Sequence, residues 1–336
     1  MITWDNSPNI TTYEAFYKCK RYISTHNNIL VSLSGGADSD VMLDLIIKAA
    51  TEENISKDRF YFVFFDTGIE YQATKDHLDY LENKYNIKIE RIRAATPVPL
   101  GCKRYGQPFL SKYVSEMIYR LQKHNFKFED EPFDILFTKY PNCKIALMWW
   151  CNQHKNKNGR TSKFNIDYNK HLKEFMVSNP PKFKISNKCC KGAKKDNAHN
   201  YIREKGIDLN CVGIRKAEGG IRSSAYSSCF SDNRSYDFEK PNQKLKNYDD
   251  YRPIFWFTDK DKKEYDEFFN IKHSDCYCKY GLKRTGCVGC PFGRDFESEL
   301  ETAKQYEPKL FNAVNNIFKD SYEYIRKFVE FKKERK

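Results

Sequence analysis

The segment from Asn28 to Lys48 reads NILVSLSGGADSDVMLDLIIK, and it decides the expected fold. An apolar run over residues 29–33 leads into a tight turn, Ser-Gly-Gly, and an apolar segment with helical periodicity begins at Val41. This order predicts a strand, a glycine loop and the N-terminus of a helix, which direct backbone N–H groups and the positive end of the helix dipole towards an anion. Because glycine lets the backbone approach a phosphate closely, the segment predicts a phosphate-binding loop.

The loop motif SGGADS, residues 34–39, differs from two common nucleotide-binding loops. Its spacing matches neither GxxxxGKS nor GxGxxG. A glycine turn in an ordinary α/β protein is the alternative interpretation of so short a motif. Three later segments favour the phosphate-binding interpretation.

The later segments place polar residues after short apolar runs. Residues 59–70 read RFYFVFFDTGIE, an apolar strand that ends in DTG with a glutamate just beyond it. Residues 210–222 read NCVGIRKAEGGIR, a short strand followed by two arginines and a glutamate. Residues 252–261, RPIFWFTDKD, join an apolar-aromatic segment to an acidic helix start. Polar side chains at the carboxyl ends of parallel strands lie where open α/β sheets bind ligands.

Taken in order, SGGxDS, DTGxE, GxRxxE and the apolar-aromatic segment resemble the phosphoadenosine phosphosulfate (PAPS) reductase family. That family lies within the PP-loop ATP pyrophosphatases (the adenine nucleotide alpha hydrolase-like superfamily), whose members hold ATP at the glycine loop and cleave it between the α and β phosphates. The resemblance runs from about Asn28 to Phe292, with insertions. It implies that the chain binds ATP, or an adenylylated sulfonucleotide, together with Mg²⁺.

The resemblance and the chemistry of these residues together predict a nucleotide site. The loop backbone is expected to hold the terminal phosphates, and Asp38 to bind Mg²⁺ or orient the loop, with helix capping as the alternative. The arginines are expected to pair with phosphate or sulfate, or else to form surface salt bridges. Asp38 and Arg215 are the predicted catalytic residues. The predicted nucleotide-binding residues are Ser32, Ser34, Gly35, Gly36, Asp38, Ser39, Asp66, Thr67, Gly68, Glu70, Arg215, Glu218 and Arg222.

The pattern of apolar residues predicts an α/β fold. Strands are expected over residues 29–33, 61–65 and 87–92, and helices over 12–25, 39–50 and 73–85. Thr11 and Glu14 have the spacing of a capping box for the first helix. The βαβαβ order implies a doubly wound parallel sheet with right-handed crossovers.

The domain organisation is expected to be a nucleotide-binding domain interrupted by an insertion. We expect its first half over residues 11–100, the insertion over 101–180, its second half with the candidate cluster cysteines over 181–296, and a helical tail over 297–336. A small cysteine-rich helical subdomain is expected at the C-terminal side.

Twelve cysteines in a chain that we expect to be cytoplasmic are more typical of metal ligands or reactive thiols than of disulfides. Cys287 and Cys290 form a C-x-x-C motif, whereas Cys189 and Cys190 are adjacent, which is awkward for a mononuclear zinc site. A Cys-Cys pair followed later in the chain by C-x-x-C resembles the 4Fe-4S ligand set of the adenylylsulfate reductases. That resemblance implies an iron–sulfur cluster on these four residues.

Two alternatives stay open, a zinc site and a redox-active C-x-x-C. Cys276 or Cys278 is close enough in sequence to replace one of the cluster ligands. The remaining cysteines are expected to be small buried residues, and they are Cys19, Cys102, Cys143, Cys151, Cys211 and Cys229.

The net charge of +13 suggests an anionic partner, although lysines scattered over solvated surfaces are an equal alternative. Residues 181–206 hold eight basic residues against two acidic ones, around the Cys-Cys pair. No apolar run approaches the roughly 18 residues of a membrane span. The N-terminus lacks the features of a signal peptide, so we expect a cytoplasmic protein that does not bind membranes.

One departure from the reductases separates the candidate functions. Reductases of the family use a mobile C-terminal cysteine, but no cysteine follows Cys290 here. We therefore expect activation of an acceptor by adenylylation, with release of pyrophosphate, followed by iron–sulfur-dependent sulfur transfer. The family's DNA phosphorothioation sulfurtransferases suggest a nucleic-acid acceptor and a sulfur donor such as a cysteine desulfurase. A sulfonucleotide reductase and an ATP-binding regulatory or defence-associated module are the alternatives.

Overall fold

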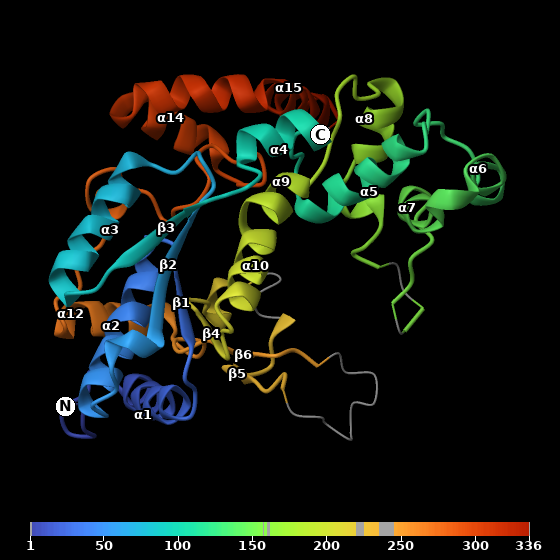
Figure 1. The fold of residues 1–336 in the computed structure, drawn as a ribbon. Helices are drawn as coiled ribbons and strands as arrows, with labels where there is room; N and C mark the ends of the chain where they lie inside the picture. The colour runs from blue at the N-terminus through green and yellow to red at the C-terminus, as the bar shows by residue number, and fades with distance from the viewer. Residues whose placement is uncertain (1, 157, 160–161, 220–224, 235–244, 336) are drawn as a thin grey trace. The chain divides into compact units, whose positions relative to one another are not determined.

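The computed structural model describes residues 2–156, 158–159, 162–219, 225–234 and 245–335. The chain forms two compact units (Figure 1). The first, here called the sheet unit, comprises Met1–Ala94 and Lys194–Cys287. The second, the helical unit, comprises Ala95–Ala193 and Val288–Lys336.

A six-stranded sheet forms the centre of the sheet unit, with the strand order β3-β2-β1-β4-β6-β5. Neighbouring strands run parallel except β5, which pairs antiparallel with β6 at one edge. The strands are β1 (Ile29–Leu33), β2 (Phe60–Asp66), β3 (Ile89–Arg93), β4 (Leu209–Val212), β5 (Phe230–Ser231) and β6 (Asp249–Tyr251). The predicted α/β class is confirmed, and the sheet departs from a fully parallel one only at the two-residue edge strand.

Successive side chains of β1 point to opposite faces of the sheet and belong to two separate hydrophobic cores. Ile29, Val31 and Leu33 belong to the large core, which also contains residues of the helices α1, α2, α3 and α12. Leu30 belongs to a smaller core with Tyr201 and neighbouring residues. Because successive strand residues point to opposite faces, helices cover both faces of the sheet, as in a doubly wound fold. The helices of this unit are α1 (Ile10–Ser24), α2 (Ala37–Glu52), α3 (Gln72–Tyr85), α10 (Asp196–Glu204), α12 (Asp259–Phe268) and α13 (Asp275–Cys278).

The helical unit is held together largely by aromatic packing. Phe175 of α8 contacts Tyr324 and Phe328 of α15, with ring centroids 4.9 and 5.1 Å apart. Gln107 accepts a hydrogen bond from the backbone N–H of Ser321 (2.9 Å), which ties α15 to the start of this unit. The helices are α4 (Val98–Tyr105), α5 (Lys112–Lys123), α6 (Phe133–Lys139), α7 (Lys144–Trp150), α8 (Leu172–Ser178), α9 (Lys188–Cys190), α14 (Phe296–Tyr306) and α15 (Pro308–Lys333).

Short 3-10 and π segments complete the elements. They are η1 (Lys57–Arg59), η2 (Pro141–Cys143), η3 (Ile166–Tyr168), η4 (Lys191–Lys195) and η5 (Lys216–Glu218). None of the described helices is both long and apolar enough to cross a membrane.

Candidate functional site

The glycine loop, residues 34–36, lies between the end of β1 and the start of α2, at the point where the strand order reverses. Strand β1 pairs with β2 on one side and with β4 on the other, so the crevice at their carboxyl ends is where open α/β sheets bind ligands. Gly35 has a φ of +63°, and a Cβ at this position would lie 2.5 Å from Cγ2 of Thr74. Both the backbone conformation and the space therefore require glycine.

Serine hydroxyls hold the loop in shape from within. The Ser39 hydroxyl accepts hydrogen bonds from the N–H groups of Ser34 (3.3 Å) and Gly36 (3.2 Å), and it donates to the Gly36 carbonyl (2.8 Å). Ser32 is half-buried within β1, between its partners in β2 and β4. A Cβ on Gly213, just after β4, would lie 3.1 Å from Cα of Ser39, so α2 begins in close contact with this neighbouring segment.

The two predicted catalytic residues form an ion pair. Nε of Arg215 donates to the Asp38 carboxylate (2.9 Å), and its Nη1 donates to Asp259 (2.8 Å). Glu218 accepts a hydrogen bond from the backbone N–H of Arg215 (3.2 Å) and thereby fixes the turn that presents the guanidinium. Burial acts to lower the pKa of Arg215, but its bonds with Asp259 and Asp38 raise it overall. Arg222, the other predicted arginine, lies outside the described residues.

The DTG turn after β2 is organised by Glu70. Its carboxylate accepts hydrogen bonds from the N–H groups of Thr67 (3.0 Å) and Gly68 (3.1 Å) and from the Thr67 hydroxyl. Asp66 accepts from the Gly68 N–H (2.7 Å) and pairs with Lys75 (3.1 Å). Burial and a hydrogen bond with Asp66 raise the pKa of Glu70, whereas the pKa of Asp66 is lowered despite its burial. Glu70 therefore shapes the turn, and Asp66 is the more readily ionised carboxyl group.

A buried cluster of histidines and aspartates beside the loop has no counterpart in the sequence analysis. Asp40, in the first turn of α2, accepts from Nδ1 of His273 (2.8 Å), whose Nε2 lies 3.0 Å from Asp266. Nε2 of His77 lies 3.0 Å from the same oxygen of Asp40, poorly aligned for a hydrogen bond. Burial acts to lower the pKa of His273, but the two aspartates raise it to about 9.

A second structure missed from the sequence is a strap, here defined as residues 273–287, which returns to the loop. The Ser274 hydroxyl donates to the Ala73 carbonyl (3.0 Å), and Sγ of Cys276 lies 3.5 Å from the Thr74 hydroxyl. Tyr277 accepts a hydrogen bond from the N–H of Ala37 (3.1 Å). At the end of the strap, Sγ of Cys287 lies 3.4 Å from the Thr67 hydroxyl.

The four predicted cluster ligands belong to different units. Cys287 belongs to the sheet unit, and Cys189, Cys190 and Cys290 belong to the helical unit. The thiol of Cys189 hydrogen-bonds with Cys102 and Cys190, and Cys290 lies close enough to affect its charge; the contact with Cys102 is the main reason that the pKa of Cys189 is raised. Cys102 was expected to be only a small buried residue.

The approach of Cys102 to Cys189 has a structural cause in Gly101. A Cβ on Gly101 would lie 3.0 Å from Cα of Cys189, so glycine allows α4 and α9 to meet closely. Within the described part of the chain, no group of three or more His, Cys, Asp or Glu side chains is arranged to hold a metal ion. Thiols can bind a metal as thiolates, and in this structure the Cys189 thiol hydrogen-bonds with Cys102 and Cys190.

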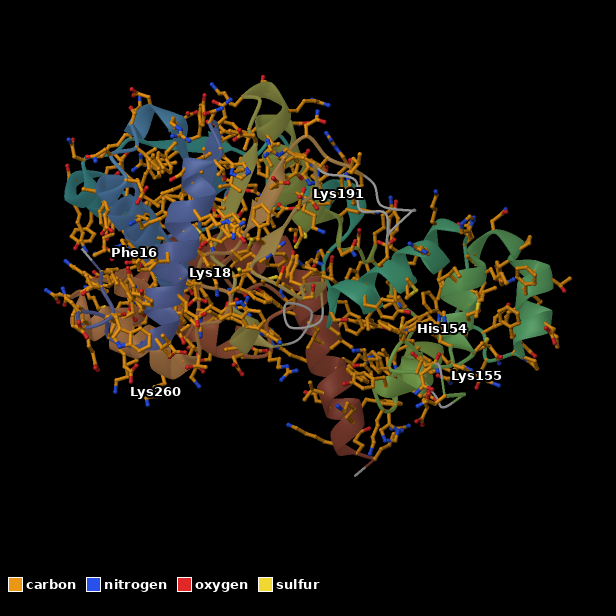
Figure 2. All side chains as sticks on the ribbon, turned by 90° about the horizontal axis from the view of Figure 1, so that it is seen from below. Phe16, Lys18, His154, Lys155, Lys191 and Lys260 are labelled. Atoms are coloured by element: carbon orange, nitrogen blue, oxygen red, sulfur yellow. The ribbon has the colours of Figure 1, made fainter. Side chains whose placement is uncertain are left out.

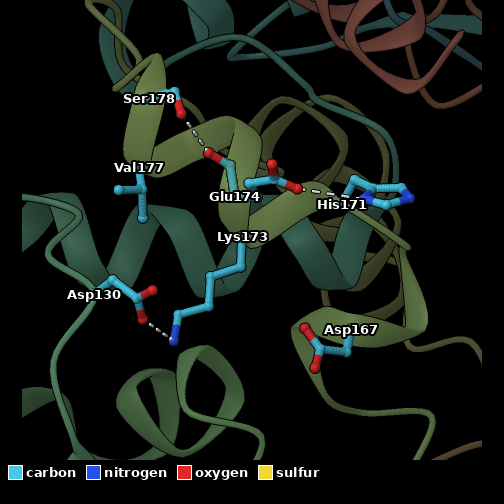
Figure 3. A pocket seen from close by; sticks show the side chains of 7 residues that line it. All are labelled: Asp130, Asp167, His171, Lys173, Glu174, Val177 and Ser178. Atoms are coloured by element: carbon cyan, nitrogen blue, oxygen red, sulfur yellow. Dashed lines mark hydrogen bonds and ion pairs between the residues drawn. The ribbon is translucent and has the colours of Figure 1, made fainter. Parts of the chain in front are cut away.

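A surface pocket of about 360 Å³ lies in the helical unit, and none of the predicted site residues lines it (Figure 3). Within it, Lys173 pairs with Asp130 (2.5 Å) and His171 with Glu174 (3.3 Å). Because these charges are already paired and no predicted residue lines the pocket, we assign it no function. Its lining residues are Asp130, Asp167, His171, Lys173, Glu174, Val177 and Ser178.

Basic side chains extend from many elements of the chain (Figure 2). The labelled lysines come from α1 (Lys18), the segment after α7 (Lys155), η4 (Lys191) and α12 (Lys260). This distribution agrees with the expectation of lysines on solvated surfaces, and it does not distinguish the basic segment over residues 181–206 from the rest of the chain.

Comparison with known protein families finds a match over part of the chain. Residues 28–138 match the family described as phosphoadenosine phosphosulfate reductase domain. Among curated proteins, no sequence matches the chain significantly.

Solved structures with low sequence identity are also similar to the chain. The PAPS reductase of Candida auris, in a phosphate complex, is 12% identical, with 81% of this chain and 87% of that chain covered and a TM-score of 0.40. The FMN adenylyltransferase of Candida glabrata, with FMN and an ATP analogue, is 10% identical (86% and 66% covered, TM-score 0.42). The U34-tRNA thiolase of Methanococcus maripaludis, with its 4Fe-4S cluster, is 13% identical (94% and 79% covered, TM-score 0.39).

Proposed function

We propose that the chain is a PP-loop enzyme that cleaves ATP to AMP and pyrophosphate, and the match of residues 28–138 to the phosphoadenosine phosphosulfate reductase domain supports this proposal. The observation that carries this proposal is the Asp38–Arg215 ion pair, which stands beside a glycine loop at the carboxyl ends of β1 and β4. An anion-binding loop and a buried guanidinium at one crevice suit a phosphate chain better than an uncharged ligand.

The residues of this crevice divide the chemistry between them. The loop and the N-terminus of α2 bind the phosphates through backbone N–H groups, and the glycines allow the close approach. Mg²⁺ usually takes one or two carboxylates together with substrate phosphates, and Asp38 offers such a carboxylate at the helix start. Mg²⁺ bound there would neutralise charge on the leaving pyrophosphate. Arg215 stabilises the negative charge that develops on the phosphate oxygens during transfer.

We further propose that the first half-reaction transfers AMP to an acceptor. An acceptor oxygen attacks the α-phosphorus, the bond from that phosphorus to the bridging oxygen breaks, and pyrophosphate leaves with the bond electrons. A sulfide-level sulfur nucleophile then displaces AMP from the acceptor. If the donor is the persulfide of a cysteine desulfurase, an external dithiol cleaves its S–S bond and is itself oxidised to a disulfide. The protein groups orient the phosphate and stabilise charge in both displacements, and neither displacement changes the oxidation state of the acceptor carbon or phosphorus.

An iron–sulfur cluster on the cysteines belongs to the same proposal. A bound 4Fe-4S cluster would supply a site that holds the sulfur atom before its transfer. Within the helical unit, the cysteines that would hold it are Cys102, Cys189, Cys190 and Cys290. The proximity of the Cys102, Cys190 and Cys290 thiols to Cys189 supports this assignment.

For the acceptor we propose a nucleic acid or another polyanion. Lys194, in the basic segment, lies close enough to Glu70 of the DTG turn for its charge to act on the pKa of that carboxyl group. Lys194 thus brings a positive charge of the basic segment near the DTG turn, where cations attract a polyanion through its phosphates.

A specific contact also favours the second candidate, a sulfonucleotide reductase. The Cys287 thiol lies beside Thr67 of the DTG turn, where it could attack the sulfur of an adenylylsulfate and release AMP. The resulting thiosulfonate would need an external dithiol to release sulfite, while that dithiol is oxidised to a disulfide.

Product analysis tests the proposed function. Protein incubated with ATP and Mg²⁺ is expected to form AMP and pyrophosphate, and Asp38→Asn is expected to abolish most of this turnover. Asp76→Asn, on the exposed surface of α3, is the matched control and should keep full turnover. ADP and phosphate as main products would contradict the assignment. Reduction of adenylylsulfate without ATP cleavage would favour the reductase, and ATP binding without turnover in the presence of candidate acceptors would favour the regulatory module.

A further inference from the structure

The first helical N–H of α2 has an acceptor supplied by the chain itself. Tyr277 accepts the hydrogen bond from the N–H of Ala37 over 3.1 Å, although 240 residues separate the two in sequence. N–H groups in the first turn of a helix have no partner within the helix, and they are the groups that bind phosphate at a helix N-terminus. The Tyr277 hydroxyl therefore stands where a phosphate oxygen would accept this bond.

A second hydroxyl of the strap supports that position. The Thr285 hydroxyl lies 3.3 Å from the Tyr277 hydroxyl. A Cβ added to Gly36 would lie 3.0 Å from the Thr285 hydroxyl and 3.2 Å from the Tyr277 hydroxyl. Both hydroxyls thus press against the glycine loop, and glycine at position 36 leaves the room for them.

We propose that the Tyr277 hydroxyl is an internal substitute for a phosphate oxygen, which pyrophosphate or the phosphates of ATP displace from the Ala37 N–H. This inference rests on the proposed function, because it takes the loop over residues 34–39 to be the phosphate site. When phosphate binds, the Ala37 N–H gives up its hydrogen bond to Tyr277 and donates to a phosphate oxygen instead. Because no hydrogen bond is gained at this N–H, the strap lowers the affinity for phosphate. Displacement of Tyr277 also loosens the part of the strap on which it stands.

The remaining contacts of the strap set where such loosening is expected. His273 and Ser274 anchor its beginning, through Asp40 and the Ala73 carbonyl. Cys276, next to Tyr277, is fully buried against the Thr74 hydroxyl. Loosening around Tyr277 is therefore expected to expose the Cys276 thiol, whereas a buried cysteine outside the strap, Cys211 in β4, should stay protected.

Calorimetric titration with pyrophosphate tests the exchange directly. Tyr277→Phe keeps the ring but removes the competing hydroxyl, so it is expected to bind pyrophosphate about three- to tenfold more tightly than the unchanged chain, the equivalent of one net hydrogen bond. Thr285→Val should give a smaller increase in the same direction. Tyr280→Phe is the matched control, because Tyr280 lies on the same strap but packs against Tyr71. The affinity of this variant for pyrophosphate should equal that of the unchanged chain.

Thiol labelling of the unchanged chain, followed by mass spectrometry, supplies the second measurement. Pyrophosphate is expected to accelerate labelling of Cys276 and to leave Cys211 unchanged. Equal or weaker pyrophosphate binding by folded Tyr277→Phe would overturn the inference, since Tyr277 would then be neutral or a phosphate ligand. If the unchanged chain and all variants bind neither pyrophosphate nor ATP, the proposed function fails too. If the unchanged chain and the variants bind pyrophosphate with equal affinity, the inference about Tyr277 is refuted but the proposed function is not.

Discussion

Arg215 donates a hydrogen bond from Nε to the Asp38 carboxylate across 177 residues of sequence. The side chain of Arg215 is only 10% exposed, and its Nη1 makes a second bond, to Asp259. The guanidinium thus joins three segments: the start of α2, the turn after β4 and the start of α12. A single planar cation with several fixed donors is well suited to this position, because an ammonium group cannot make both contacts in the same geometry.

Arg215→Lys is expected to reduce the kcat/KM for pyrophosphate release on the order of 10- to 100-fold while the fold is retained. The charge remains, but the two-directional contact with Asp38 and Asp259 is lost. Release of pyrophosphate from ATP, followed with a coupled assay, measures the effect. Arg203→Lys, on the exposed surface of α10, is the control and should be unaffected. Unchanged turnover in Arg215→Lys would show that the ion pair has only a structural role.

The histidine and aspartate cluster predicts a pH-dependent stability. His273 lies within contact distance of Asp40 in α2 and of Lys262 and Asp266 in α12. His77 of α3 lies beside Asp40. Since the folded pKa of His273 is raised to about 9, its contribution is fully present below the unfolded value and is lost as the pH rises through about 9. The pKa of Asp40 is lowered by its histidine partners despite burial, so its own contribution is lost only on strong acidification.

His273→Gln is therefore expected to lower the free energy of unfolding by about 1–2 kcal/mol near pH 6, with a smaller difference at pH 10. Denaturant unfolding of both proteins across this range measures the difference. The control is His171→Gln, because His171 is exposed and pairs only with Glu174 at the surface. A difference that grows with rising pH would contradict the prediction.

The thiol contact between Cys102 and Cys189 makes a prediction about bound iron. If the cluster uses the cysteines of the helical unit, Cys102→Ser should lose most of the iron and sulfide of anaerobically purified protein, as should Cys189→Ser. Cys143→Ser, a buried cysteine of the same unit, should change only stability. Iron and sulfide analysis with visible absorption measures the outcome. Loss of the cluster in Cys287→Ser but not in Cys102→Ser would restore the ligand set expected from the sequence, and stoichiometric zinc would exclude both sets.

The basic segment makes a prediction about salt dependence. Substitution of Lys191, Lys194 and Lys195 together by Ala is expected to weaken nucleic-acid binding and to flatten the plot of log affinity against log salt by up to about three units. Fluorescence anisotropy with a labelled oligonucleotide measures this slope, and iron content should not change. The control is the triple replacement by Ala of Lys18, Lys155 and Lys260, which removes the same charge from other elements. It should leave the slope almost unchanged. Undetectable binding by the unchanged chain at low salt would reject a nucleic-acid acceptor.

Most of the sheet and the loop could be predicted because their signals are local. Apolar runs and glycines marked β1, β2 and the start of α2, and the predicted helix over residues 39–50 lies within the observed Ala37–Glu52. The start of the first helix was predicted wrongly. Asn9, rather than the Thr11–Glu14 box, caps α1, since its side chain accepts from the Thr12 N–H (2.8 Å) and also bonds to Glu264 of α12. The Asn9 side chain makes both bonds at once, so this cap also links α1 to α12.

The parts of the site that were missed depend on contacts between distant segments. His273 reaches Asp40 across 233 residues, and neither the spacing nor the periodicity around either residue signals such a pair. For Cys102 a signal was present: it follows a glycine, as do Cys287 and Cys290. The glycine is closely packed in two of these Gly-Cys pairs, at Gly101 and Gly289, whereas a Cβ on Gly286 would meet nothing within 4 Å.

The interruption of the sheet unit by residues 95–193 has a consequence for biosynthesis. Strand β1 is made early, yet its partner β4 emerges only after the whole interrupting segment has been synthesised. Until then β1, β2 and β3 have an unpaired central edge, which is a template for wrong pairing and aggregation. Because closure over so long a loop is entropically slow, the joining of β4 to β1 is expected to limit the rate of folding. Newly made chains should therefore depend on chaperones mainly during the interval between β3 and β4.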